Sequence, residues 1–213
     1  MKQAGADVEL VYLQGLDIKP CLGCYTCWTR TPGRCIRRDD MAVLLPKLES
    51  EIVVLATPLY VDGMNGPMKT FLDRSIPLLE PAVELRDGHC RHPRRAKGGA
   101  GRLVLVSACG FTELDNFDLL VAHVSAMCRN MSREFSGALL RPYAATLPSL
   151  RKSGLPVDEV VTACLHAGRE LVKTGKMDPA TLAAVSSEVI AREQYIEGLN
   201  AFYLGRIEKA KQD

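Results

Sequence analysis

Apolar and polar positions alternate along the chain in blocks that are typical of an α/β protein. Residues 52–56 and 103–107 form almost continuous apolar runs, as expected of strands that are buried on both faces of a parallel sheet. Residues 8–13 are rich in Val and Leu and favour another strand. Residues 137–144 favour a further strand, and Pro142 within it indicates a sheet edge.

Helical patterns separate these strands. Asp39 and Asp40 predict a helix that runs to about Glu51, because carboxylates favour a helix N-terminus. Pro67 suits the first turn of the next helix, which directs Met68, Phe71 and Leu72 inward. Residues 77–101 are expected to form a long loop. Further helices are predicted over residues 116–128, 157–174, 179–192 and about 193–209.

This alternation predicts an α/β fold with a doubly wound parallel sheet and additional C-terminal helices. We expect residues 1–150 to form this domain, and residues 151–213 to pack on it or on a partner subunit. Ligands of such sheets lie beyond the carboxyl ends of the strands, so the loops after Ala56 and Ser107 are the expected binding region. The length of 213 residues, with 47% apolar and 24% charged residues, fits a single globular domain.

Composition excludes several function classes. The net charge of +2 gives no electrostatic case for binding nucleic acid or an anionic membrane. No apolar run approaches the ~20 residues that span a bilayer, and the first residues lack a stretch of signal-peptide type. We therefore expect a cytoplasmic protein. In a reducing compartment, clustered cysteines are metal ligands or redox groups more often than disulfides.

Four of the eight cysteines fall within one short segment. Cys21, Cys24 and Cys27 are spaced at intervals of three residues, and Cys35 follows a turn that contains Pro32-Gly33. Such a run with a more distant fourth cysteine is a recurring way to hold an iron–sulfur cluster. Zinc remains an alternative because thiolates select soft metals, although zinc sites usually consist of two separated pairs. Free thiols or a redox disulfide are a third interpretation.

Several motifs in order resemble the iron–sulfur flavoproteins, a branch of the NADPH-dependent FMN reductase and flavodoxin-like superfamily. The resemblance covers roughly residues 1–145. Its motifs are Pro20-Cys21-Leu22-Gly23-Cys24-Tyr25-Thr26-Cys27, Cys35, Asp39-Asp40-Met41, Ala56-Thr57-Pro58-Leu59-Tyr60 and Lys69-Thr70-Phe71-Leu72-Asp73-Arg74.

The resemblance implies a flavodoxin-like fold, FMN, a 4Fe-4S cluster and electron transfer between the two cofactors. It places the cluster on Cys21, Cys24, Cys27 and Cys35. It also implies that two loops lie beside the flavin ring. These loops contain Thr57, Pro58, Leu59, Tyr60, Gly63 and Met64, and Ser107, Ala108, Cys109 and Gly110.

The sequence differs from the family in the region that would bind the flavin phosphate. Members of the family begin with a strand and a Ser/Thr-rich loop that holds the FMN phosphate at a helix N-terminus. This sequence has no counterpart of that strand or loop, so we expect the sheet to lack its first strand and the chain to bind FMN weakly or not at all. No general acid or base is assigned.

The expected partners are NAD(P)H or a small redox carrier, and a second copy of the chain. The homo-oligomer is expected because residues 182–202 carry more apolar side chains than a peripheral helix needs. Two other functions remain open. One is an NAD(P)H-dependent FMN or quinone reductase with structural cysteines, and the other is a non-catalytic, zinc-stabilised binding module.

Overall fold

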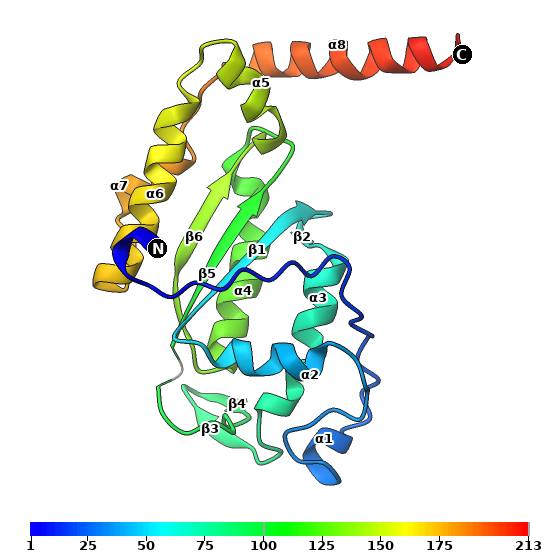
Figure 1. Ribbon diagram of the computed structural model, residues 1–213, viewed down its shortest axis with the longest axis vertical. Helices are drawn as coiled ribbons and strands as arrows, with labels where there is room; N and C mark the ends of the chain where they lie inside the picture. The colour runs from blue at the N-terminus through cyan, green and yellow to red at the C-terminus, as the bar shows by residue number, and fades with distance from the viewer. Residues whose placement is uncertain (100, 213) are drawn as a thin grey trace.

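A four-stranded sheet with the order β2-β1-β5-β6 forms the centre of the molecule (Figure 1). This computed structural model describes residues 1–99 and 101–212. The strands β1 (Ile52–Tyr60), β5 (Arg102–Ala108) and β6 (Glu134–Arg141) are parallel, whereas the short β2 (Gly63–Met64) returns antiparallel to β1. The predicted parallel α/β sheet is confirmed, and β6 lies at its edge as Pro142 indicated.

Helices cover both faces of this sheet, because neighbouring residues of a strand point to opposite sides. Leu103 and Leu105 pack in one core with α2 (Met41–Leu44), α3 (Gly66–Asp73) and α4 (Asp118–Asn130). Val104, between them, packs in a second core with α6 (Val157–Thr174) and with residues near α7 (Pro179–Val185). The predicted helices at 116–128 and 157–174 therefore form the two layers.

The structure corrects several predicted boundaries. The helix expected over residues 39–51 is one α-helical turn followed by the 3₁₀ helix η2 (Leu45–Glu49), which begins at the residue before Pro46. Residues 77–101 are not a simple loop. They contain part of η3 (Ile76–Leu78) and a hairpin of β3 (Glu84–Arg86) and β4 (His89–Arg91). The helix expected over 179–192 ends at Val185.

The strand predicted over residues 8–13 does not form. This segment has no regular secondary structure and pairs with no strand of the described residues, and Leu10 and Tyr12 are exposed. A strand gains stability from its neighbours, and among residues 1–99 and 101–212 nothing pairs with residues 52–58 of β1 on the side away from β5. The same open edge explains why β1 continues through Pro58, which lacks the N–H that a second neighbour would need.

The C-terminal part adds η5 (Ala144–Thr146), α5 (Leu147–Lys152) and α8 (Arg192–Ala210) to α6 and α7. The helix α6 lies against the sheet, whereas α8 projects away from it (Figure 1). The remaining short helices are η1 (Lys2–Ala4), α1 (Thr26–Thr29) and η4 (Leu114–Phe117). Across the described residues, none of the helices combines the length and the apolar character that a membrane crossing requires.

Candidate functional site

A cavity between the end of α3 and the cysteine loop (residues 14–38) is lined by all four clustered cysteines, and we call it the cysteine cavity. Arg37 and Arg74 also line it, together with Ile76 and Pro77 from the start of η3. The four thiols differ in burial: two are exposed, one is half-buried and one is buried. Cys21 and Cys24 are exposed, Cys35 is half-buried and Cys27 is buried.

Backbone turns bring these cysteines together. Gly23 and Gly33 adopt positive φ angles of 63° and 78°, and Tyr25, the residue before α1, has a φ of 50°. The positive φ at position 33 favours glycine, and a Cβ there would also approach Arg95 Cδ to 3.1 Å. The Trp28 indole nitrogen donates to the carbonyl of Ile76 at 3.2 Å, which fastens α1 to η3.

The electrostatics of the cavity reflect the crowding of thiols. Burial raises the pKa of Cys27, and the neighbouring thiols of Cys35, Cys24 and Cys21 raise it further. Hydrogen bonds from Thr26 lower the pKa of Cys24, and the charge of Arg37 adds to this effect. The backbone N–H of Gly23 donates to Cys21 Sγ at 3.4 Å. Donors and positive charge thus surround the thiols.

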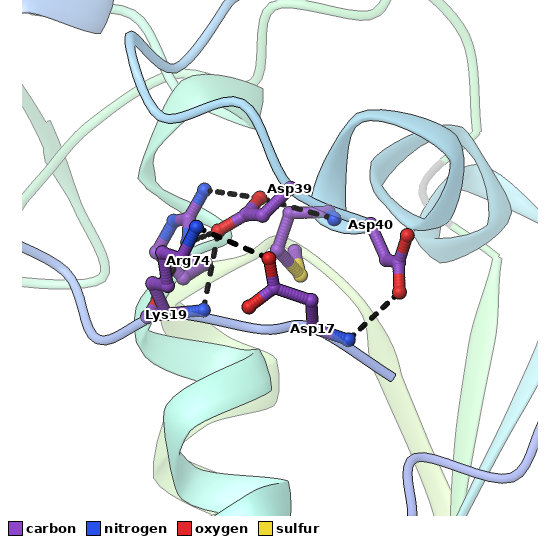
Figure 2. A network of polar contacts seen from close by, with 6 residues as sticks. Asp17, Lys19, Asp39, Asp40 and Arg74 are labelled. Atoms are coloured by element: carbon purple, nitrogen blue, oxygen red, sulfur yellow. Dashed lines mark hydrogen bonds and ion pairs between the residues drawn. The ribbon is translucent and has the colours of Figure 1, made fainter. Parts of the chain in front are cut away.

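A buried ion pair closes the base of the cysteine loop. Arg74 Nη1 lies 2.6 Å from Asp39 Oδ2, Arg74 Nη2 lies 3.0 Å from Asp39 Oδ1, and the two side chains are 1% and 0% exposed. Figure 2 shows Arg74 also donating to the carbonyl of Lys19, whose own N–H donates to Asp39. Because Lys19 precedes Cys21 and Asp39 follows Cys35, this clasp holds both ends of the segment that carries the thiols.

The clasp gives Arg74 and Asp39 roles that their neighbours in sequence do not indicate. Arg74 does not pair with its neighbour in sequence, Asp73, which instead contacts Lys69 at 2.6 Å on the surface. Asp39 does accept a hydrogen bond from the N–H of Met41, near the start of α2, but it also neutralises Arg74. Sequence reasoning missed Arg74 as a lining residue of the cysteine cavity, and the only signal was its place in the motif after Phe71 and Leu72.

The two loops predicted to flank a flavin do lie side by side. The register pairs Thr57 with Ser107 and Pro58 with Ala108, and the Ser107 hydroxyl donates to the carbonyl of Thr57 at 2.8 Å. Thr57, Ser107 and Cys109 are buried, Pro58, Leu59, Gly63, Met64 and Ala108 are half-buried, and Tyr60 and Gly110 are exposed. The α3 N-cap, Asn65, donates its N–H to Thr57 Oγ1 at 3.2 Å. The loops therefore meet at one end of α3 and the cysteine cavity lies at the other, about 12 Å of helix apart.

The first of these loops contains a strained turn. Val61 and Asp62 connect β1 to β2 with φ angles of 49° and 58°, although neither is glycine. Positive φ is unusual for a β-branched residue, and the Val61 side chain is 100% exposed, so no packing compensates for it. Sequence reasoning named Tyr60 and Gly63 on either side of this turn but not the strain between them.

Residues 91–97 include several basic side chains, and Arg94 and Arg95 among them are engaged within the molecule. Arg94 forms an ion pair with Glu49, and Arg95 contacts Glu80 and donates to the carbonyls of Pro77 and Leu79. His92 contacts the carbonyl of Ala82 at 2.9 Å. This arrangement favours a structural role over a binding site for a nucleotide phosphate.

Comparison with known proteins supports the resemblance that the motifs indicate. Residues 1–90 match the family described as NADPH-dependent FMN reductase. An iron–sulfur flavoprotein of Archaeoglobus fulgidus is 40% identical over 78 residues, which cover 36% of this chain and 34% of that relative. An iron–sulfur flavoprotein of Methanocaldococcus jannaschii is 32% identical over 77 residues, 36% of this chain and 39% of the relative. Over these segments the chain is similar to the iron–sulfur flavoproteins.

The similarity covers only part of the length of these relatives. The matched segments span 34% to 39% of these curated relatives. Among solved structures, a flavone reductase superposes with a TM-score of 0.52 at 20% identity, over 86% of this chain and 54% of that one. At this identity the likeness shows the fold alone, and it confirms the flavodoxin-like α/β architecture.

Proposed function

We propose that this relative of the iron–sulfur flavoproteins transfers electrons between FMN and a 4Fe-4S cluster held by Cys21, Cys24, Cys27 and Cys35. The observation that carries the proposal is the convergence of these four thiols on one cavity. When bound, the flavin exchanges one or two electrons and the cluster relays one at a time. NAD(P)H or a small redox carrier is the proposed external partner.

The surroundings of the thiols fit an anionic cluster. Arg37 and Arg74 line the cysteine cavity, and the Nε–H of each is buried without an acceptor in the described part of the chain. A buried donor without a partner costs about 1–3 kcal/mol, which acceptor sulfurs in the cavity would recover. Cysteines, guanidinium groups and backbone N–H groups together form a donor set suited to a thiolate-bound, negatively charged centre.

A single zinc ion fits this arrangement less well. Zinc is held tetrahedrally with Zn–S distances of about 2.3 Å, so its ligands must lie close to one another. Within residues 1–99 and 101–212, no three Cys, His, Asp or Glu side chains are arranged to share one ion. This holds for zinc and for a cluster alike, so the choice between them rests on the cysteine spacing, a tight run of three with a more distant fourth, which favours the cluster.

The flavin part of the proposal rests on the two loops at the other end of α3. A Cβ atom at Gly110 would meet no atom within 4 Å, and one at Gly63 would make only ordinary contacts. The protein itself thus leaves open space beside these backbones, where a planar ligand can lie. No residue is assigned to the FMN phosphate, and we expect the isolated chain to hold FMN weakly.

The decisive experiment is anaerobic purification followed by measurement of iron, sulfide, zinc and flavin. We expect about four iron atoms per chain, a visible cluster absorbance and less than stoichiometric flavin. Cys27→Ser should abolish the iron, whereas Cys90→Ser, a control at an exposed cysteine outside the cavity, should retain it. One zinc and no iron would support the zinc-stabilised binding module. NADPH oxidation without iron would support the reductase with structural cysteines.

A further inference from the structure

Arg74 is a buried cation whose guanidinium group is only partly satisfied by the protein. Its side chain is 1% exposed, and its Nη atoms donate to the Asp39 carboxylate and to the carbonyl of Lys19, neither of which lines the cysteine cavity (Figure 2). Its Nε–H is buried and finds no acceptor within residues 1–99 and 101–212. Because Arg74 itself lines the cysteine cavity, one of its donors is left free at the wall of that cavity.

Cys35 is the thiol that acts on Arg74. Burial alone would lower the pKa of Arg74, but its hydrogen bonds with Asp39, followed by the charge and hydrogen bond of Cys35, raise this pKa above its ordinary value. The interaction is mutual, so Arg74 favours negative charge on the Cys35 sulfur. Cys35 lines the same cavity as the other three thiols, so the stabilised charge lies within the candidate site.

Burial distinguishes Arg74 from the arginines that lie nearby in the cysteine loop. Arg37 also lines the cavity but is half-buried, and Arg38 is exposed and does not line it. Water and salt screen a charge at an exposed position, whereas a charge inside the protein acts through a medium of low polarity. Of these three arginines, Arg74 therefore acts on the cavity with the least screening.

We propose that Arg74 sets the reduction potential of the cluster, by donating its free Nε–H to the sulfurs of the cysteine cavity while Asp39 offsets its positive charge. This inference rests on the function proposed above, in which the cavity holds a cluster. Reduction by one electron adds negative charge to a thiolate-bound cluster, and hydrogen bonds to the sulfurs and nearby positive charge stabilise the reduced form. The Nε–H of Arg74 therefore raises the potential, and the Asp39 carboxylate lowers it.

The test is a redox titration of the anaerobically purified, iron-loaded protein with dithionite as the reductant, followed by electron paramagnetic resonance of the reduced cluster. Arg74→Lys keeps a positive charge beside Asp39 but removes the Nε–H. At a fixed potential it should lower the ratio of reduced to oxidised cluster roughly tenfold, which is about 59 mV for a one-electron couple. Asp39→Asn keeps the Nε–H but removes the counter-charge, so it should raise the same ratio.

The opposite signs separate an effect on the potential from a structural role alone. If the clasp only held the cysteine loop in place, Arg74→Lys and Asp39→Asn would loosen the same loop and would move the potential in the same direction. Arg38→Gln is the matched control, because it removes an exposed charge from the same loop. It should change the ratio by less than about twofold, since solvent screens that charge.

Iron analysis and circular dichroism precede each titration, so that the possible failures can be told apart. A wild-type chain without iron would overturn the proposed function and this inference together. An iron-loaded wild type whose potential responds to the two variants in the same direction, to neither of them, or equally to Arg38→Gln would overturn this inference alone. If one of the two variants loses the cluster, the direction of the shift in the other decides. Loss of iron from both would assign Arg74 a structural role only.

Discussion

Replacing Asp39 with Asn isolates the contribution of the clasp beneath the cysteine loop. The Asp39 carboxylate accepts hydrogen bonds from both Nη atoms of Arg74, from the N–H of Lys19 and from the N–H of Met41. The amide of Asn has almost the same shape but has one acceptor oxygen and no charge. Asp39→Asn therefore leaves the Arg74 guanidinium charged and buried without its counter-ion.

The expected cost follows from that burial. Removing one partner of a buried ion pair costs about 3–5 kcal/mol, a large share of the roughly 5–15 kcal/mol by which a domain is stable. We expect urea unfolding followed by circular dichroism to show a loss of this size for Asp39→Asn. The cysteine loop should open before the sheet unfolds, because the clasp joins Lys19 to Asp39 on either side of it. Faster alkylation of Cys27 in native protein would report that opening.

Asp73→Asn is the control, since it removes the same chemical group from an ion pair that is about half exposed. Its cost should stay within about 1 kcal/mol. Equal effects of Asp39→Asn and Asp73→Asn, or a loss below about 1 kcal/mol at position 39, would refute the reasoning.

The same pair predicts a pH dependence. Hydrogen bonds from Arg74 hold the pKa of Asp39 below its usual value of 3.8. The carboxylate therefore contributes its stability above pH 3.8, and this contribution is lost as the pH falls through the lowered pKa of the folded state. The stability difference between wild type and Asp39→Asn should shrink over that range.

Three further changes test other parts of the structure. Val61→Asn should raise the unfolding free energy by about 1 kcal/mol, because Asn tolerates the positive φ of this fully exposed turn; a decrease in denaturation midpoint would contradict it. Gly101→Ala should cost about 2 kcal/mol or more, since its Cβ would lie 2.4 Å from the carbonyl oxygen of Glu51 at a φ of +67°; normal stability of this variant would show that the loop can shift. Burial raises the pKa of Cys128 from 9.0 to about 11, so the wild type should lose about 2–3 kcal/mol as the pH rises from 9 to 11. That loss should be missing from the alkaline unfolding profile of Cys128→Ala.

The sequence predicted those parts of the fold that depend on local pattern. Residues 103–107 form a strand because an uninterrupted apolar run can be buried between two helical layers. Residues 52–56 also form a strand, but it is not buried on both faces as predicted, because Val54 and Ala56 are exposed. Met68, Phe71 and Leu72 point inward from α3 because their spacing places them on one face. Turn residues such as Gly33 bring Cys35 back towards Cys27, which the spacing of the cysteines already indicated.

Contacts between segments that are distant in sequence were harder to predict from the sequence. The sequence around Arg74 does not indicate its partner, because the acidic residue next to it is Asp73. Instead, Arg74 lies at the C-terminal end of α3 facing the cysteine loop, and its partner is 35 residues earlier. Nothing in the helical periodicity of residues 66–73 identifies that partner, because burial of a charge depends on which loop covers it.

The segment at residues 8–13 shows the same limit for a strand. Its composition favours β-structure, yet strand stability comes from cross-strand pairing rather than from the chain alone. In the part of the molecule that the structure describes, the open edge of β1 and residues 8–13 do not pair, and Val54 of β1 is exposed along with Leu10 and Tyr12. Residues 8–13 and β1 thus both favour β-structure, but the two segments form no hydrogen-bonded pair with each other in the described part of the chain.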